Sequence, residues 1–475
     1  MSPPSPSRRR LWNERGRKKV SLTKIWLIFL ALMLALLCAA LLHVYSHFPL
    51  TTSATLKHQS RAKKSVLSSH LRIESEGGSA DGGMDGGLQL TTEVNVKHPP
   101  RVFTCRCYPQ VKYAFAMRGF SMKRHEDDYE GSWIIWKTGT DIDAKRLQPW
   151  QRPNHFPGER QMDRKGTMYQ VLRQYGLQNG ETLDFLPETY LLYSETDKDE
   201  FVKRLDANGG GMDMPWVLKR ATASRGRGVT MLGPQSDELI ELRDELIDGP
   251  IKRGHIIQSY IKNEWTFQGH KCDLRVYVVV ASVDPLIVYY HDGIVRTAVG
   301  LHDEENFSDG KAHLTNVSQN KENRTLWEPV KTFDELEEEL KAYVQSSPVS
   351  LDSNRKDPIQ HIREQIKRIL GVVFSAFKDR ISLSKIPVDN AFAVMGADFV
   401  IDADLKVWLL EMQLGPQLLG DKHKGKTAVL QDVLTTTIDV VEEVYHKQLN
   451  RQPLLPLKTS RNLELVYAGE YLFGR

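Results

Sequence analysis

The feature that most constrains this chain is residues 396–417, GADFVIDADLKVWLLEMQLGPQ. Two runs rich in Phe, Val, Ile, Trp and Leu, residues 397–402 and 407–413, flank a short Ala-Asp-Leu-Lys turn. Bulky and β-branched residues around a turn that contains Asp predict a β-hairpin. We therefore expect a sheet at the centre of the fold, with this hairpin in it.

The polar residues of the hairpin predict a metal site. In a symmetric hairpin Asp398 lies opposite Glu411, and Gln413 shares the face of Glu411 because side chains alternate along a strand. Opposed carboxylates repel each other, so a positive charge is expected between them. Mg²⁺ fits, because it takes oxygen ligands and binds between carboxylates and substrate phosphates. The alternative is an ordinary amphipathic hairpin whose acids face solvent, and the hairpin alone leaves both open.

Length, charge and cysteine content limit the possible functions. A chain of 475 residues is long enough for two to four domains, and 64 Lys and Arg against 60 Asp and Glu indicate no nucleic-acid partner. The four cysteines are too few for a disulfide scaffold, and metal binding by Cys105 and Cys107 lacks a second Cys or His pair.

The N-terminal region predicts a membrane anchor. Residues 1–24 form a basic tail, and residues 25–42 are eighteen apolar residues without a charge. As a helix they would extend about 27 Å, close to the ~30 Å bilayer core. Eight basic residues before the span favour a lumenal body, and we expect a single-pass signal-anchor protein of the ER or Golgi, with the side of the membrane left open. Residues 43–100, rich in Ser, Thr, Gly and Lys, are expected to be a flexible linker.

Two stretches suggest a phosphate site. A strand at residues 216–220 ends near Lys219, a loop carrying Arg225, Gly226 and Gly228 follows, and residues 229–232 form a second strand. Glycines let backbone amides approach phosphate oxygens, and the cations add charge. A plain basic hairpin turn is the alternative.

The second stretch is a strand that begins polar and continues apolar. Lys271, Asp273 and Arg275 share one face at period two before the apolar run begins, which favours a site at the strand's end. The next hairpin, residues 286–290 and 293–297, carries Arg296.

Other elements position these stretches. We expect strands at residues 111–117 and 132–137, and a helix at residues 167–177 closed by Gly176. Basic residues Arg164 and Lys165 open that helix, which is unfavourable at a helix N-terminus and suggests an anionic ligand there. His155 lies in a turn-rich loop, where a hydrogen-bonded structural role is favoured over catalysis. Scaffold helices are expected at residues 332–345, 359–379 and 428–445.

Read together, these motifs resemble the tubulin–tyrosine ligase-like family, a branch of the ATP-grasp superfamily. The matching pieces occur in family order between about residues 101 and 447: NHFPG, WVLK with SRGRGV, QSYIKN, GHKCDLRVYV, DGIVRT, HLTNVSQNK and GADFVIDADLKVWLLEMQ. The resemblance implies an α+β ATP-grasp fold of mixed and antiparallel sheets with flanking helices, after the anchor and linker. Its parts would be an N-terminal part at 101–185, a central lid at 186–262, a C-terminal metal-binding part at 263–450 and a tail at 451–475.

The resemblance also implies roles for individual residues. Lys219 would contact ATP phosphate, and the loop with Arg225 and Gly226 would close over it. The backbone that holds adenine would come from Gln258, Ser259, Tyr260 and Ile261. The remaining nucleotide contacts would come from Lys271, Asp273, Thr315 and Asn316. Arg275 and Arg296, together with Lys271, would be catalytic and bind the incoming amino acid or the phosphorylated carboxylate. The Mg²⁺ ligands would be Asp398, Glu411 and Gln413.

The implied activity is ATP- and Mg²⁺-dependent ligation of an amino acid of the glutamate, glycine or tyrosine class to a protein carboxylate through an acyl-phosphate. The expected acceptor is tubulin or a tubulin-like acidic tail. Gln413 stands where the family has Asn, Gly415 where it has Ser, and Val317 where some members have Tyr. These departures leave two alternatives open: a weak or inactive membrane-anchored ATP- or protein-binding pseudoenzyme, and an ATP-grasp enzyme with a secretory-pathway acceptor.

Overall fold

A computed structural model describes residues 99–140, 142–207, 212, 214–220, 228–234, 236–248, 254–303, 310–313, 315, 327–347, 357–382, 390–420 and 423–469. The chain divides into Met1–Thr91 and Thr92–Arg475, and every described residue belongs to the second unit. The expected membrane segment at 25–42 lies outside the described residues, as do Arg225, Gly226, Asn316 and Val317. Among the helices that are described, none is both long and apolar enough to cross a bilayer.

The largest sheet is antiparallel in its central strands and has the order β12-β11-β10-β13-β14, with β9 paired to β10 and β15 to β11. The predicted hairpin is confirmed as β13 and β14, in which Asp398 pairs with Glu411. The break expected between residues 290 and 293 is absent, because β11 runs through it with a bulge against β10. The strands are β9 Thr266–Phe267, β10 His270–Val283, β11 Leu286–Thr297, β12 Val330–Thr332, β13 Ala393–Ile401, β14 Val407–Gln413 and β15 Glu464–Ala468.

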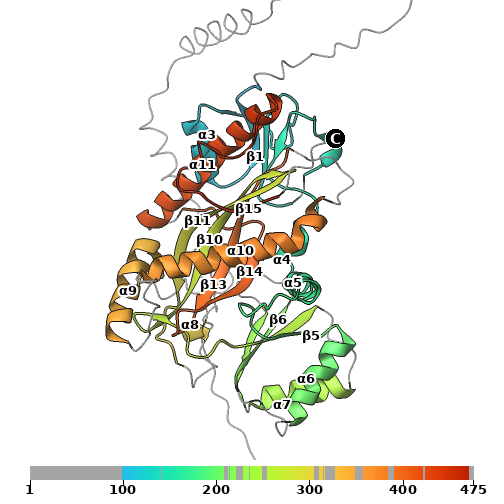
Figure 1. Ribbon diagram of the computed structural model, residues 1–475, viewed down its shortest axis with the longest axis vertical. Coiled ribbons are helices and arrows are strands. Elements are labelled where there is room, and N and C mark those ends of the chain that lie inside the picture. The colour runs from blue at the N-terminus through green and yellow to red at the C-terminus, as the bar shows by residue number, and fades with distance from the viewer. Residues whose placement is uncertain are drawn as a thin grey trace, which may run out of the picture. The chain divides into compact units, whose positions relative to one another are not determined.

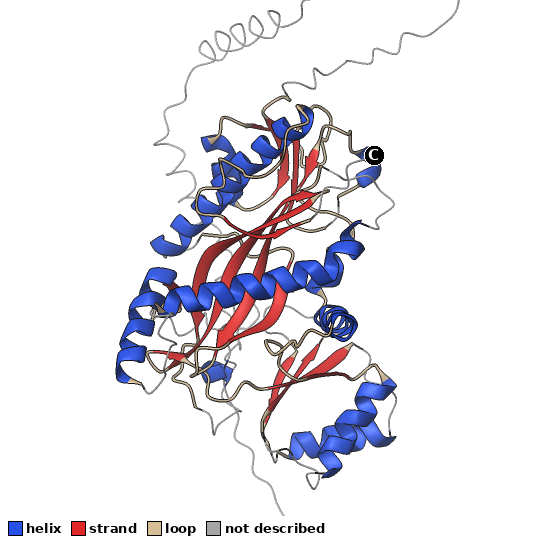
Figure 2. Cartoon of the chain, in the orientation of Figure 1, coloured by secondary structure: helices blue, strands red, loops and turns tan. Residues whose placement is uncertain are grey.

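Both faces of this sheet are covered because its long strands are apolar on both sides. Along β10, Val276, Val278 and Val280 pack into a core with α9 (Phe333–Ser346) and α10 (Pro358–Ser382). The alternate residues Tyr277, Val279 and Ala281 pack into a second core with α11 (Lys424–Leu449). Figures 1 and 2 show α10 crossing the sheet. The three expected scaffold helices are thereby confirmed.

A smaller antiparallel sheet, with the order β5-β8-β6-β7, forms the central part of the chain. The predicted strands at 216–220 and 229–232 are confirmed as β6 and β7, and their joining loop at 221–227 lies outside the described residues. Trp216, Phe201 and Leu239 belong to a separate small core with the helices of this part. The elements are β5 Thr189–Leu191, β6 Trp216–Arg220, β7 Val229–Leu232, β8 His255–Ser259, α6 Glu195–Ala207 and α7 Asp237–Asp248.

The N-terminal part contains a parallel sheet with the order β2-β1-β3-β4. Here the predicted strand at 111–117 is wrong, because it is helix α3 (Pro109–Met117). Proline in the first turn suits a helix start, and the buried residues Val111, Ala114 and Phe115 follow helical spacing. The predicted strand at 132–137 is confirmed as β3. The other elements are β1 Val102–Arg106, β2 Ser121–Met122, β3 Ile134–Lys137, the 3₁₀ turn η1 Ala144–Arg146 and β4 Arg152–Pro153.

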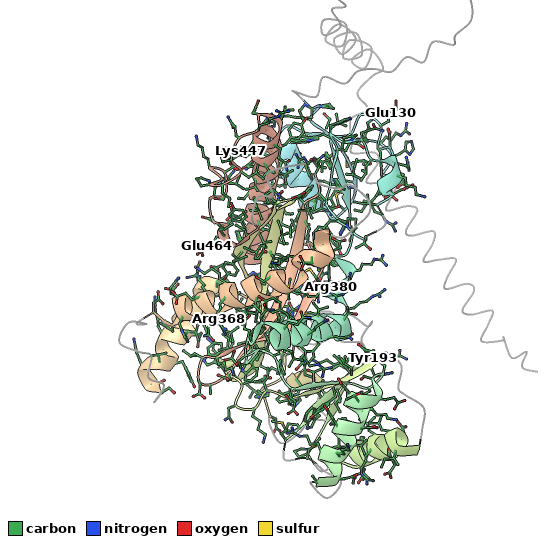
Figure 3. All side chains as sticks on the ribbon, turned by 45° about the vertical axis from the view of Figure 1, so that its right-hand side comes forward. Glu130, Tyr193, Arg368, Arg380, Lys447 and Glu464 are labelled. Atoms are coloured by element: carbon green, nitrogen blue, oxygen red, sulfur yellow. A yellow bond between two sulfur atoms is a disulfide. The ribbon has the colours of Figure 1, made fainter. Side chains whose placement is uncertain are left out.

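Helix α5 (Lys165–Asn179) follows α4 (Arg160–Asp163) and supports the small sheet. The predicted closure at Gly176 is wrong: the helix ends at Gly180, which has a left-handed φ of 63°. Gly176 instead lies inside the helix, where a Cβ would crowd Leu183. Gly166 similarly leaves room for the ring of Tyr193, a residue labelled in Figure 3.

Candidate active site

The predicted site residues of the central sheet come together as a buried ionic network on neighbouring strands. Asp273 pairs across the strands with Arg296, and Arg275 pairs with Asp398. Arg296 Nε donates to Asp273 Oδ1 at 2.6 Å, and Arg296 Nη2 donates to Asp398 Oδ2 at 2.8 Å. Arg275 binds both oxygens of Asp398, with Nη2 at 2.8 Å from Oδ2. The Thr315 hydroxyl donates to Asp273.

Two charges of each sign make this network neutral, which is how charged groups are tolerated in a sheet interior. Burial alone would raise the pKa of Asp398, but Arg275 and Arg296 outweigh it and hold that pKa below its ordinary value. The pKa of Asp273 is raised, because burial outweighs the attraction of Arg296 and the charge of Asp398 adds to it. The charges of the two arginines and the two aspartates therefore balance within the network.

Two glycines make room for Arg275. Gly293 lies at the β10–β11 bulge, where a Cβ would overlap the carbonyl oxygen of Arg275. Gly396 faces the Arg275 side chain, and a Cβ there would lie 3.0 Å from Arg275 Cδ and 3.2 Å from Pro416. Backbone at these positions must approach closely, so glycine is required for steric reasons.

The second predicted carboxylate, Glu411, lies beside the network on β14. Lys165 Nζ approaches Glu411 Oε2 at 2.6 Å, and Gln413 Nε2 donates to Glu411 Oε1 at 2.5 Å. Lys165 is the first residue of α5, so the unfavourable cation at this helix N-terminus is compensated by a carboxylate of the chain itself. Sequence reasoning noted Lys165 but could not identify its partner.

The three predicted Mg²⁺ ligands fit a hard cation unequally. Glu411 and Gln413 present adjacent polar groups, and an amide that rotates can offer oxygen instead of nitrogen. Both oxygens of Asp398 are instead occupied by arginine. Within the described ranges no group of three or more His, Cys, Asp or Glu side chains could hold a metal ion. Glu411 and Gln413 thus fit Mg²⁺, and Asp398 would have to exchange arginine contacts to join them.

Lys219 reaches this site from the small sheet. Its ammonium donates to Gln258 Oε1 at 2.5 Å, a neutral partner. Burial lowers the pKa of Lys219 to about 8, an effect opposed by Glu411 and reinforced by Lys165 and by Lys271. Within the described ranges its hydrogen-bond partner is this neutral amide, and an amine held near two other cations is suited to bind an anion.

Lys271 lies at the start of β10 and has a carboxylate partner that the sequence did not indicate. Its ammonium donates to Glu264 and, at 3.1 Å, to the Tyr260 hydroxyl. Burial would lower the pKa of Lys271, but the charge of Glu264 outweighs it and raises that pKa. Glu264 was missed because it precedes the alternating stretch, so no periodic pattern includes it.

The segment predicted to hold adenine joins the small sheet to the large one. The backbone amides of Ser259 and Tyr260 already donate to the carbonyls of Glu188 and Pro215, at 2.8 and 3.0 Å. Ile261 and the Gln258 side chain are buried. Any ligand bound here would therefore use other groups of the segment.

His155 has the structural role that its loop suggested. Its Nδ1 lies 2.7 Å from Glu159 Oε1 and its Nε2 lies 3.0 Å from the carbonyl oxygen of Lys137. An oxygen atom thus lies within hydrogen-bonding distance of each ring nitrogen. His155 therefore holds its loop in place.

The chain is similar in sequence to several known proteins. The mouse protein "Probable tubulin polyglutamylase TTLL2" is 29% identical over 317 residues, 65% of this chain and 55% of its own length. "Protein polyglycylase TTLL10" of Macaca fascicularis is 27% identical over 356 residues, 70% of this chain and 52% of its own length. The human "Inactive polyglycylase TTLL10" is 27% identical over 307 residues, 60% of this chain and 43% of its own length.

The chain thus spans about half the length of the relatives it matches. The model of the "Tubulin-tyrosine ligase family" matches residues 142–450, which include every element of the site described above. This match covers more than half of the sequence, and the protein belongs to the tubulin-tyrosine ligase family, within the ATP-grasp superfamily.

Proposed function

We propose that this protein is an ATP- and Mg²⁺-dependent ligase that joins an amino acid to a side-chain or terminal carboxylate of a protein. The observation that carries the proposal is the placing of Arg275 and Arg296 beside the Glu411–Gln413 pair, with Lys219 reaching the same place. Cations and oxygen ligands converge there without a side-chain nucleophile, which suits phosphoryl and acyl transfer by positioning.

Each step has a group in this chain to support it. The acceptor carboxylate oxygen attacks the terminal phosphorus and ADP leaves, giving an acyl-phosphate. The amine of the amino acid then attacks the acyl carbon, phosphate leaves with the bonding electrons, and the departing phosphate takes up the proton that the nitrogen loses. Lys219 neutralises phosphate charge, while Arg275 and Arg296 hold the carboxylate that reacts.

Magnesium, held by Glu411 and Gln413, would neutralise the charge of the phosphates during transfer. Asp398 keeps the two arginine side chains in fixed positions, which lowers the cost of orienting them when substrate binds.

The names of the relatives narrow the substrates. They are described as polyglutamylases and polyglycylases, some of them acting on tubulin. We propose glutamate or glycine as the amino acid and an acidic tail of tubulin type as the acceptor. The test is mass spectrometry of candidate acceptors incubated with the purified protein, Mg-ATP and each amino acid in turn. A mass increase of one residue that requires ATP is expected, and its absence with every acceptor would contradict the proposal.

The metal assignment has its own test. Asp398→Ala and Glu411→Ala are each expected to abolish Mg²⁺-dependent ATP turnover. Asp398→Ala removes the carboxylate that positions both arginines, and Glu411→Ala removes a Mg²⁺ ligand. Unchanged turnover in the folded Glu411→Ala variant would exclude Glu411 as a ligand.

A second candidate function is that of an inactive ATP- or protein-binding relative. Two observations favour it: arginines occupy Asp398, and Gln413 extends one methylene beyond Asn, a misplacement that Mg²⁺ tolerates poorly. A relative described as inactive exists. Nucleotide binding without ADP release under every acceptor condition would support this candidate over the ligase.

We further propose that the body lies on the lumenal side of an ER or Golgi membrane, anchored by residues 25–42. Support comes from the apolar span and from the disulfide between Cys105 and Cys107, since disulfides persist in oxidising compartments. In that case the acceptor is a secretory-pathway protein with an acidic segment. Protection of the body from protease in intact microsomes is expected, and digestion without detergent would contradict the orientation.

A further inference from the structure

Helix α3 is apolar on the side that the rest of the described protein leaves uncovered. Its buried side, which packs with the parallel sheet and α11 (Figure 1), consists of Val111, Ala114 and Phe115. Its outer face consists of Lys112, Tyr113, Ala116 and Met117, all exposed. Tyr113 and Met117 lie one helical turn apart and are 48% and 58% exposed. A surface helix usually presents polar residues to water, so this outer face is suited to an apolar or interfacial environment.

The chain enters the fold beside this outer face. Strand β2, which contacts α3, forms one edge of the parallel sheet, and its Met122 is 48% exposed. Ser121 N donates to the carbonyl oxygen of Arg101 at 2.8 Å, so the first described residues lie alongside β2. The apolar span at 25–42 lies upstream of them in the sequence. The exposed apolar residues therefore belong to the part of the fold that follows the proposed anchor most closely along the chain.

The charge of this region has one sign. Between residues 99 and 125 the sequence has six lysines and arginines and neither Asp nor Glu. Arg101 and Arg118 pair with acidic residues of α11. Lys112 and Arg124 are exposed, and no ion pair joins either of them to another described residue. The outer face of α3 and the segment after β2 therefore offer positive charge beside exposed apolar side chains.

A bilayer surface matches this combination better than a second copy of the chain does. Tyrosine rings are favoured at the level of the lipid headgroups, where lysine and arginine also bind lipid phosphates. Methionine is flexible and adapts to irregular apolar surroundings. In a twofold contact between two copies the same patch meets itself, so the cations of one copy would approach those of the other.

We propose that the outer face of α3, together with Met122, lies on the surface of a phospholipid bilayer. Tyr113 and Met117 enter the interfacial layer, while Lys112 and Arg124 bind lipid phosphates. The inference rests on the proposed membrane anchoring, because a face this small binds a bilayer weakly and a tether raises its effective concentration there. It adds a defined side of the body that is turned toward the membrane.

The first experiment measures lipid contact on the full chain. The chain, with Cys38→Ala, is incorporated into nanodiscs of phosphatidylcholine and phosphatidylserine, and a fluorophore is attached at Met117→Cys. Cys272 is buried and Cys105 and Cys107 form a disulfide, so the new thiol is the one that reacts. Lipids that carry a nitroxide close to the headgroup should quench this fluorophore about twofold or more.

Ile247→Cys is the matched control for position. Ile247 lies on α7, in the part with the smaller antiparallel sheet, and is 47% exposed, close to the value of Tyr113. A fluorophore at this position should show little quenching by the same lipids.

The second experiment reverses the charge beside the apolar residues. Lys112→Glu combined with Arg124→Glu, both at exposed positions, should remove about half or more of the quenching at position 117, because the carboxylates repel lipid phosphates. Lys203→Glu combined with Lys378→Glu is the control, since these exposed lysines lie on α6 and α10. Circular dichroism checks that each variant is folded.

The outcomes separate this inference from the anchor. Quenching at position 117 that does not exceed the quenching at position 247, in incorporated chains, overturns the inference and leaves the anchor standing. Failure of the full chain to incorporate contradicts the anchor itself. Shielding of the fluorophore that rises with protein concentration, without quenching by the labelled lipid, identifies a second copy as the cover and also overturns the inference.

Discussion

Two buried polar clusters of this protein look alike until their partners are compared. One is the network of Asp273, Arg275, Arg296 and Asp398 on the central sheet. The other, in the N-terminal part, joins Lys137, Asn154, His155 and Glu159 through hydrogen bonds of 2.7–3.0 Å. Both are buried, and both are extensively hydrogen-bonded.

The difference lies in what the side chains bind. In the N-terminal cluster Asn154 bonds the backbone N–H and C=O of Lys137, and His155 bonds the same carbonyl. These bonds satisfy the main chain and complete a loop. In the sheet network every bond between the four residues joins two ionised side chains, and Glu411 lies opposite Asp398 on the next strand. Burial alone thus does not identify a site; what distinguishes the sheet network is that arginine and aspartate side chains bind one another, beside a further carboxylate on the next strand.

The largest expected effect comes from removing the shared cation of the network. Arg296→Ala leaves Asp273 and Asp398 without their common partner, and we expect a loss of about 3–5 kcal/mol in the free energy of unfolding, together with loss of turnover. Chemical denaturation measures the first. Arg363→Ala is the control, because Arg363 pairs with the more exposed Asp292 and should cost about 1 kcal/mol or less. Equal losses in the two variants would show that the network is no more than a surface-type ion pair.

A substitution in the N-terminal cluster is expected to lower the stability of the protein without changing its catalytic rate. Asn154→Ala removes both hydrogen bonds to the Lys137 backbone and should lower the free energy of unfolding by about 1–3 kcal/mol. At temperatures where the variant is folded, kcat should equal that of the wild type. A reduced kcat in folded protein would make this loop part of the active site and remove the contrast between the clusters.

Lys219 gives the candidate site a pH dependence. Its pKa is lowered to about 8 from an ordinary value of 10.5, so the free protein loses this charge as the pH rises above 8. Affinity for a triphosphate should then fall by up to about tenfold per pH unit above 8. Stability should change in the opposite sense between pH 8 and 10.5, because the unfolded chain keeps a proton that the folded chain releases.

Titration of nucleotide affinity from pH 7 to 9.5 tests this, with Lys219→Arg as the control, because its charge persists across the range. A pH-independent affinity in the wild type would mean that Lys219 does not contact the anion.

The smallest expected effect is that of Gln413→Asn. Shortening the amide by one methylene retains the oxygen donor, so Mg²⁺-dependent turnover should stay within a few-fold of the wild type or rise. Steady-state kinetics at saturating Mg²⁺ measures it. A large rise in turnover would support the candidate function in which the wild-type protein is inactive. Complete loss of turnover would show that the site requires the longer glutamine side chain.

Local patterns predicted the parts of the fold that depend on near neighbours in the sequence. The β13–β14 hairpin follows from a short turn between two apolar runs. The Asp398–Glu411 pair also depends on a register shift of one residue between Asp398 and Phe399, which the sequence did not indicate. The prediction for residues 111–117 failed because a short apolar segment suits strand and helix alike, and Pro109 with the neighbouring core decided for a helix. Gly176 was misread as a helix end because a buried glycine and a capping glycine look the same in sequence.

What the sequence by itself determined is which residues carry charge and which face of a strand each one shares, because alternation is a property of the extended backbone. The tertiary structure alone decided their partners. Asp398 meets Arg275 and Arg296 across separations of 123 and 102 residues, and Glu411 meets Lys165 from another part of the chain. Ion pairing depends on distances of a few ångströms, and these are fixed only when separate strands and helices pack together.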